Sequence, residues 1–401
     1  MSLFSAIELA PRDPILGLNE AFNADTRTDK VNLGVGVYFN EAGKIPLMQA
    51  VAQAEALRQE AQAARGYLPI EGVVAYSAEV QKLLFGADSA LLANQQVATV
   101  QSIGGTGALK LGADFIHTLN SSGVVAISNP SWENHRALFT TAGYQVLDYT
   151  YYDPVSHGLD LAGMLSDLEA LPERSVVVLH ACCHNPTGVD LTADDWKQVI
   201  SLLQRKQHIP FLDIAYQGFG DGIEEDAVAV RLFADSGLNF FVASSFSKSF
   251  SFYGERVGAL SMVCSSAQEA EHVLSQVKRV IRTNYSNPPT HGATIVSTVL
   301  SNPELNALWQ QELGEMRDRI KQMRHLMVEQ LKTKGANQDF SFVTAQRGMF
   351  SYSGLNAVQV DRLREEFGIY AVSTGRICVA ALNLGNIDAV TDAMVAVSGK
   401  A

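Results

Sequence analysis

Features that would anchor the chain in a membrane or stabilise it in an oxidising compartment are scarce. The opening residues, MSLFSAIELAPRDP, contain no basic segment followed by an apolar one, which argues against a secretory signal. No uninterrupted apolar run approaches the roughly 20 residues that span a bilayer. The four cysteines are too few for a disulfide framework in 401 residues. We therefore expect a cytoplasmic protein with reduced thiols and no membrane partner.

Positive charge is also scarce. The chain has 30 Lys and Arg against 42 Asp and Glu, a formal net charge of -12. Nucleic-acid binding requires clustered positive charge, so we expect no nucleic-acid partner. A small anionic substrate stays possible, because a few buried arginines can dominate the field inside a cleft.

The sequence contains one candidate cluster of metal ligands, Cys182-Cys183-His184. A strand is expected over residues 175–182, and successive side chains of a strand point to opposite faces. The two thiols would then not share one ion, so the sequence predicts no metal site.

The order of apolar and helical patterns predicts an α/β protein. A chain of 401 residues with 47% hydrophobic residues favours two domains. Between about residues 95 and 265, valine-rich or aromatic runs alternate with helical patterns, which is typical of a mostly parallel sheet. The expected strands are 97–103, 124–128, 175–182, 210–214, 240–245 and 257–263.

Two helix signals accompany these strands. Thr192 and Asp195 form a start resembling a capping box. Near Met316 a long helix is expected, because apolar residues recur there at helical spacing. That helix is expected to lead into a smaller C-terminal domain. Its apolar stripe, which we interpret as core packing, comprises Met316, Ile320, Met323, Met327 and Leu331.

Lys248 lies in an unusual setting for a lysine. The segment SSFSKSFSFYGERVG (244–258) surrounds it with aromatic residues directly after an expected strand. Burial disfavours the charged form of lysine, and a lowered pKa makes the amine nucleophilic, as a Schiff-base lysine requires. The alternative is an exposed loop lysine.

A glycine-rich turn precedes one of the expected helices. Gly104, Gly105 and Gly107 permit close approach of the backbone to a ligand, and Thr106 adds a hydroxyl. The N–H groups of the following helix would point at the turn, which favours phosphate binding. The alternative is a purely structural turn.

Two further polar residues follow expected strands. Asp213 ends the strand 210–214, where open α/β sheets present ligand-binding residues, and it could pair with a protonated pyridine nitrogen. Tyr216 lies three residues further on. Asn185 opens the turn Asn185-Pro186-Thr187-Gly188. A helix cap for Asp213 and a plain turn for Asn185 are the alternatives.

Together these segments resemble the class I aminotransferases, in the aspartate and aromatic branch and nearest to the bacterial tyrosine aminotransferases. The resemblance runs end to end, through VNLGVGVY (31–38), RGYLPIEG (65–72), GGTGALKLGADF (104–115), NPSWENH (129–135), CCHNPTG (182–188), FLDIAYQGF (211–219), SSFSKSFSFYGERVG (244–258), IRTNYSNPPTHGA (281–293) and GRICVA (375–380).

The resemblance implies the fold type I of the transferases that depend on pyridoxal phosphate (PLP). In that fold a large domain, expected over residues 46–315, has a mostly parallel seven-stranded sheet and binds the cofactor. A smaller α/β domain would comprise residues 13–45 and 316–401. An N-terminal arm, residues 1–12, would contact the second subunit of a homodimer.

The resemblance also implies residue roles. Lys248 would be the Schiff-base lysine and proton carrier, Asp213 would pair with the pyridine nitrogen, and Tyr216 would contact the ring oxygen. Further cofactor contacts would come from Gly104, Gly105, Thr106, Trp132, Asn185, Ser245, Arg256 and the partner subunit's Tyr67. Substrate contacts would come from Gly36, Trp132, Asn185, Arg376 at the α-carboxylate, and the partner subunit's Arg282. The resemblance allows a cis Asn185-Pro186 bond, and the sequence does not decide between cis and trans.

Without the resemblance, Arg282 and Arg376 would be interpreted as solvated surface charges. With it, we expect amino transfer between tyrosine, phenylalanine or aspartate and 2-oxoglutarate, aromatic donors being favoured. The alternative is an aspartate aminotransferase with little aromatic activity.

Two other classes of function are less well supported. A nucleotide-dependent oxidoreductase would need a third fingerprint glycine and an acidic residue about 20 positions further on. A non-catalytic binding protein of the same fold would be expected to have altered catalytic positions, whereas all of them are present here.

Overall fold

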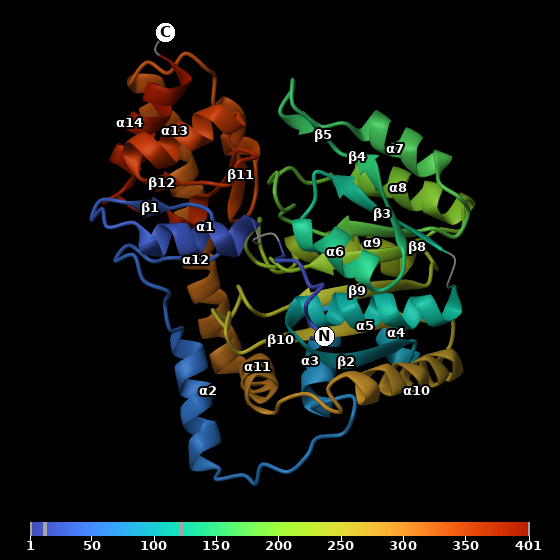
Figure 1. Ribbon diagram of the computed structural model, residues 1–401. Coiled ribbons are helices and arrows are strands. Elements are labelled where there is room, and N and C mark those ends of the chain that lie inside the picture. The colour runs from blue at the N-terminus through green and yellow to red at the C-terminus, as the bar shows by residue number, and fades with distance from the viewer. Residues whose placement is uncertain (1, 11–13, 121–122, 400–401) are drawn as a thin grey trace.

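A seven-stranded sheet forms the centre of the computed structural model, which describes residues 2–10, 14–120 and 123–399 (Figure 1). The strand order is β2-β10-β9-β8-β7-β3-β4. Only β10 runs antiparallel to its neighbours. The strands are β2 (Val97–Ile103), β3 (Val124–Asn129), β4 (Gln145–Thr150), β7 (Val176–His180), β8 (Ile209–Ile214), β9 (Phe240–Ser245) and β10 (Val257–Val263). The expected mostly parallel seven-stranded sheet is confirmed.

Helices cover both faces of this sheet. One layer comprises α5 (Gly104–Leu119), α6 (Glu133–Thr141) and α10 (Ala267–Asn284), and the other comprises α3 (Val74–Phe85), α7 (Leu161–Ala170), α8 (Ala193–Arg205) and α9 (Val228–Asp235). Val176 and Val178 of β7 pack in the hydrophobic core between the sheet and the first of these layers, whereas Val177 and Leu179 pack in the core between the sheet and the second layer. Burial on both faces explains why the central strands lack polar alternation.

The two ends of the chain form a second region beside the sheet (Figure 1). It contains α1 (Pro14–Ala24), α13 (Ala357–Phe367) and α14 (Ile387–Ser398). β1 (Val31–Asn32) pairs in parallel with β12 (Ile369–Tyr370), and β11 (Phe350–Tyr352) pairs antiparallel with β13 (Arg376–Cys378). The long helix α12 (Pro303–Thr333) runs from the sheet region into this second region. The domain boundaries at 45/46 and 315/316 stay a prediction.

Short elements complete the architecture. They are α2 (Gln49–Glu60), α4 (Ala90–Ala93), α11 (His291–Ser301), β5 (Tyr152–Asp153), β6 (Gly158–Leu159) and the 3-10 helices η1 (Glu225–Ala227), η2 (Ser341–Ala345) and η3 (Val379–Ala381). Within the described ranges, every helix is too short or too polar to cross a membrane.

Both helix signals of the sequence are confirmed. The Thr192 hydroxyl accepts from the Asp195 backbone N–H at 3.2 Å, and the Asp195 carboxylate accepts from the Thr192 N–H at 2.8 Å. The apolar stripe that begins at Met316 is buried in the main core. The long helix begins earlier than expected, at Pro303, where the Asn302 side chain caps it.

Strand β4 was not predicted. Its sequence QVLDYT places a polar and exposed residue at Gln145 and again at Asp148, because β4 is the edge strand of the sheet. An edge strand buries less of its surface than a central strand, so its apolar pattern is weak.

The strand expected over 175–182 ends earlier, at His180, and this overturns the reason for excluding a metal. Cys183 has a φ of 51°, so the side chains of Cys182 and Cys183 do not alternate. Both thiols and the Asp226 carboxylate lie within 4.8 Å of one another. The expectation that no metal binds here stays a prediction, and it now depends on the protonation of the thiols and on the hydrogen bonds of Asp226. The pKa of Cys183 is raised by its hydrogen bond with Cys182 and by burial, and the pKa of Cys182 is raised by burial against the effect of that hydrogen bond. Three backbone N–H groups already donate to Asp226.

Phe211 provides a test of the core. It is fully buried on β8, and its ring centroid lies 5.8 Å from that of Phe139 and 5.5 Å from that of Phe241. We expect Phe211→Ala to lower the free energy of unfolding by about 3–5 kcal/mol, because it removes apolar contacts and leaves a cavity. Denaturant titration measures this change. The control is Phe367→Ala at the 36% exposed end of α13, and an equal loss there would contradict the prediction.

Candidate active site

Polar side chains gather at the carboxyl ends of the parallel strands, around a cavity of about 730 Å³. Ends of parallel strands meet at one edge of a sheet, so residues far apart in the chain become neighbours there. Eleven of the residues expected in the site line this cavity, namely Gly36, Gly105, Thr106, Trp132, Asn185, Asp213, Tyr216, Ser245, Lys248, Arg256 and Arg376.

Lys248 follows β9 and projects its amine toward the cavity. Its Nζ lies 4.7 Å from the centroid of the Tyr216 ring. Burial of the amine lowers the pKa of Lys248 to about 8; the charge of Asp213 opposes this shift and that of Arg256 adds to it. The expected lowering of the pKa is therefore found, and an exposed loop lysine is the wrong interpretation.

Asp213 is held by a histidine rather than by a helix end. His135 Nε2 bonds to the Asp213 carboxylate at 2.8 Å, and His135 Nδ1 bonds to the Ser131 hydroxyl at 2.9 Å. Burial acts to raise the pKa of Asp213, but the hydrogen bond from His135 and the charges of His135, His180 and Lys248 outweigh it, so the pKa is lowered. The group is thus an oriented, ionised carboxylate.

His135 was missed by sequence reasoning although it ends the segment NPSWENH. The signal available was its place in the first turn of α6, after a strand of the same sheet. Ser131 also contacts His180 Nε2 at 3.2 Å, and burial lowers the pKa of His180 well below its usual range. A network of histidines and a serine therefore surrounds the carboxylate on its protein side.

One end of the cavity is suited to an anion. Gly104 has a φ of 68°, and a Cβ atom at this position would lie 2.5 Å from Arg256 Nη2. A Cβ at Gly258 would lie 2.4 Å from the Gly104 carbonyl carbon. Gly258 is therefore required by the close approach of the Gly104 backbone, and Gly104 by its positive φ and by the Arg256 side chain. Gly105 and Thr106 open α5, whose free N–H groups combine with the guanidinium of Arg256.

The opposite end is formed by Arg376 on β13. Its side chain is 3% exposed, which rules out a solvated surface charge. Arg376 Nη1 donates to Asn185 Oδ1 at 3.1 Å and Nη2 to the Gly34 carbonyl at 2.7 Å. Its Nε is buried without a hydrogen-bond partner among the described residues. A buried guanidinium whose acceptors are neutral, and whose Nε has no partner, is suited to binding a carboxylate.

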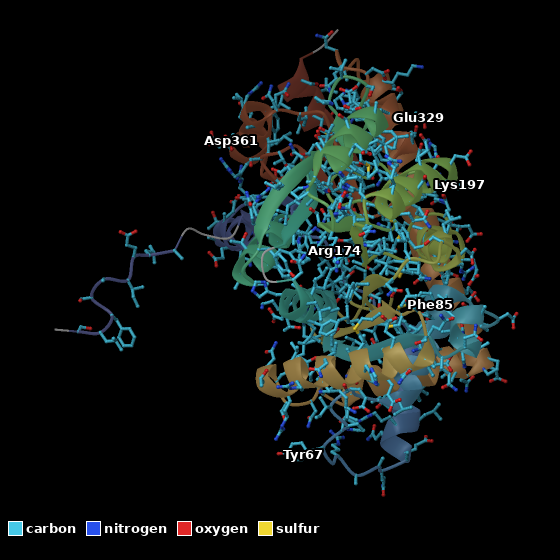
Figure 2. The ribbon with its side chains drawn as sticks, turned by 90° about the vertical axis from the view of Figure 1, so that its right-hand side faces the viewer. Tyr67, Phe85, Arg174, Lys197, Glu329 and Asp361 are labelled. Carbon is cyan, nitrogen blue, oxygen red and sulfur yellow. The ribbon has the colours of Figure 1, made fainter. Side chains whose placement is uncertain are left out.

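Three expected site residues lie outside the cavity lining. Gly104 packs directly behind it against Arg256. Tyr67 is 96% exposed and lies at the edge of the molecule (Figure 2). Arg282 lies near the end of α10, where it donates to the Ser286 hydroxyl, and borders a separate surface hollow. Within this one chain, neither Tyr67 nor Arg282 reaches the other site residues.

The cavity also has walls that the sequence did not indicate. These residues are Ile15, Leu109, Glu133, Asn134, Ala137, His180, Cys182, Ala215, Ser247, Tyr253 and Phe350. Several adjoin a recognised motif, which was the only available signal. Phe350 has none, because it comes from a short strand of the second region. The Asn185-Pro186 bond, which the sequence left open, is cis.

Comparison with known proteins gives a consistent result. The family model described as "Aminotransferase class I and II" matches residues 28–394. An aspartate aminotransferase of Pseudomonas aeruginosa is 71% identical over 397 residues, which cover 99% of this chain and 100% of the relative. An aromatic-amino-acid aminotransferase of Escherichia coli is 51% identical over 396 residues, covering 98% of this chain and 100% of the relative.

A solved structure shows the same likeness. The aromatic-amino-acid aminotransferase of Burkholderia pseudomallei, covalently bound to pyridoxal phosphate, superposes with a TM-score of 0.98. It is 67% identical, and the match covers 100% of both chains.

The charges around Lys248 predict how its reactivity depends on pH. The protein, freed of bound small molecules, is treated with an aldehyde and cyanoborohydride, which fixes the aldehyde covalently on the Lys248 amine. The extent of this labelling should rise with pH around a midpoint of about 8, because only the neutral amine attacks the aldehyde. Asp213→Asn should move the midpoint down, and Arg256→Leu should move it up. Peptide mass mapping across pH measures the labelling. A shift of the same sign in both variants would contradict this account.

Proposed function

The chain belongs to the class I and II aminotransferases, and we propose that its cavity moves an amino group between aromatic amino acids or aspartate and 2-oxoglutarate. The observation that carries the proposal is that three groups line one cavity. They are the buried amine of Lys248 with its lowered pKa, the oriented carboxylate of Asp213, and the guanidinium of Arg376, whose Nε has no hydrogen-bond partner among the described residues. These three groups are what amino transfer from a carboxylate-bearing substrate requires.

The cavity fits pyridoxal phosphate, the cofactor of this enzyme. Lys248 offers an amine for covalent attachment, and Asp213 offers a carboxylate for the pyridine nitrogen. Arg256 and the start of α5 form an anion site of the kind that a phosphate occupies. When bound, the cofactor supplies a conjugated, protonated ring that absorbs the electron pair left by removal of the α-proton.

Residues of the protein would transfer the proton and hold the cofactor. The neutral amine of Lys248 would take the proton from the substrate α-carbon and deliver it to C4′ of the cofactor. Asp213, oriented by its hydrogen bond with His135, would keep a proton on the ring nitrogen. Asn185 and Tyr216 would hold the ring oxygen, and Trp132 would stack on the ring. Gly104, Gly105, Thr106, Ser245 and Arg256 would hold the phosphate.

The substrate would lie between Arg376 and the apolar wall. Arg376 would bind the α-carboxylate as a fork, with Gly36 beside it, a geometry that lysine does not provide. Ile15, Leu109 and Phe350 contribute apolar surface to the cavity, which suits an aromatic side chain. This supports aromatic donors, and we keep them as the preferred substrates. The relatives include both aromatic and aspartate enzymes, so an enzyme with little aromatic activity is the alternative.

We further propose a cytoplasmic homodimer with shared active sites. Tyr67 and Arg282 are displaced from the cavity of their own chain, which supports their acting in a second subunit. The N-terminal segment 2–10 extends away from the body of the molecule (Figure 2). Its Leu3, Phe4, Ile7 and Leu9 are 67–100% exposed, as expected for a segment that packs on a partner. The four free cysteines fit a reducing compartment.

The direct test of function uses Lys248. Borohydride reduction of the purified protein should fix the cofactor on Lys248, as seen by peptide mapping, and should abolish its visible absorption band. Lys248→Ala should lose that band and lower amino transfer from tyrosine and aspartate by at least about 10³-fold, because no other base is positioned at the α-carbon. Undiminished amino transfer by Lys248→Ala would refute the function. Negligible turnover of tyrosine beside aspartate would refute the donor preference.

The sharing of active sites can be tested with hybrid dimers. Lys248→Ala and Arg282→Asp subunits are each expected to be nearly inactive with aspartate as homodimers. A hybrid of the two contains one site with an intact Lys248 and an intact Arg282 of the partner subunit, so it should recover about half of the activity of a wild-type dimer. A hybrid that stays inactive would show that Arg282 acts within its own subunit.

A further inference from the structure

The guanidinium of Arg376 stacks on the ring of Phe350. Arg376 Cζ lies 4.3 Å from the ring centroid. The two residues lie on adjacent antiparallel strands, in a register that places Tyr352 opposite Arg376. Phe350, two residues from Tyr352, is therefore the diagonal neighbour of Arg376 on the same face of the sheet. A cation at this distance over an aromatic face is attracted by the quadrupole of the ring.

This contact differs in kind from the other contacts of Arg376. Asn185 and the Gly34 carbonyl each use one N–H group of the guanidinium. No carboxylate among the described residues forms an ion pair with it, and burial disfavours its charge. The ring of Phe350 compensates the charge without accepting a hydrogen bond. It therefore constrains the plane of the guanidinium and leaves the buried Nε free for a ligand.

The ring itself is held from several sides. It forms a T-shaped pair with the Tyr216 ring, with centroids 5.9 Å apart. A Cβ atom at Gly36 would lie 2.7 Å from Phe350 Cζ, so the ring fills the space beside this glycine. Arg324 of α12, only 2% exposed, donates to the Phe350 carbonyl at 2.5 Å and to the Gly348 carbonyl at 2.7 Å. The strand that carries the ring is thereby anchored to the long helix.

We propose that Phe350 is a positioning residue for the substrate α-carboxylate, because its ring fixes the orientation of the Arg376 guanidinium that binds this group. The inference rests on the proposed function, which assigns a substrate carboxylate to Arg376. It goes beyond that function in making affinity for carboxylates depend on an aromatic residue that forms no polar contact with them.

The test measures equilibrium binding and not turnover. The probe is 3-phenylpropionate, which has the carboxylate and an aromatic ring but no amino group to react. Calorimetric titration of the PLP-loaded protein should give a Kd about five- to tenfold higher for Phe350→Leu than for the wild type, because leucine preserves apolar packing but lacks the quadrupole. Phe350→Tyr, which keeps the ring, should bind within about twofold of the wild type.

A double-mutant cycle separates positioning from general loss of packing. In an Arg376→Ala background, Phe350→Leu should change the Kd by less than about twofold, because the partner of the ring is gone. Phe350→Met provides a second ring-free variant if the leucine protein folds poorly. The visible spectrum of bound PLP checks that each variant retains its cofactor site.

Two kinds of failure are distinguishable. A wild-type protein that takes up neither PLP nor the acid would overturn the proposed function and this inference with it. If the wild type binds the acid and Phe350→Leu binds it equally well, only the role of Phe350 is refuted. The same holds if the full effect of Phe350→Leu persists in the Arg376→Ala background.

Discussion

An amine and a carboxylate buried in the same cavity are the constraint on which the rest of this structure depends. Removing either charge from water is unfavourable unless the other compensates it. Each group favours the charged form of the other: the charge of Asp213 limits the fall in the pKa of Lys248, and the charge of Lys248 lowers the pKa of Asp213. His135 then fixes the carboxylate in place. The chemistry of the cavity therefore comes from a balance of burial and charge.

The architecture supplies this balance by bringing strand ends together. β8 ends near Asp213, β9 leads to Lys248, and β7 leads to Asn185. Helix α5 starts at the same edge of the sheet, with the Gly104 backbone pressed against the position of Gly258 on β10. The substrate end is built differently, since Arg376 and Phe350 come from the second region of the molecule. The site thus joins a rigid sheet edge to elements anchored by α12.

Sequence reasoning succeeded for features that depend on residues adjacent in the chain. The unusual setting of Lys248 was noticed because a lysine among aromatic residues after a strand is rare, and the turn at Gly104 because glycines let the backbone approach a ligand closely. It failed where the cause is distant in the chain. The burial of Arg376 depends on Gly34 and Asn185, far apart from it in sequence, and Phe350 belongs to a three-residue strand without any periodic pattern. The geometry of Cys183 depends on a backbone conformation that its neighbours do not reveal.

The pairing of β1 with β12 has a consequence for how the protein is made. Val31 pairs with Ile369, so the segment at Val31 acquires its strand partner only after a further 338 residues have been synthesised (369 - 31 = 338). The sheet region has all of its seven strands by residue 263 and can begin to condense on the ribosome. Gly36, by contrast, lies on a segment that waits unpaired during this time. The substrate end is therefore assembled after the strands of the sheet have been synthesised, and agents that shield the nascent segment around Gly36 would act on this interval.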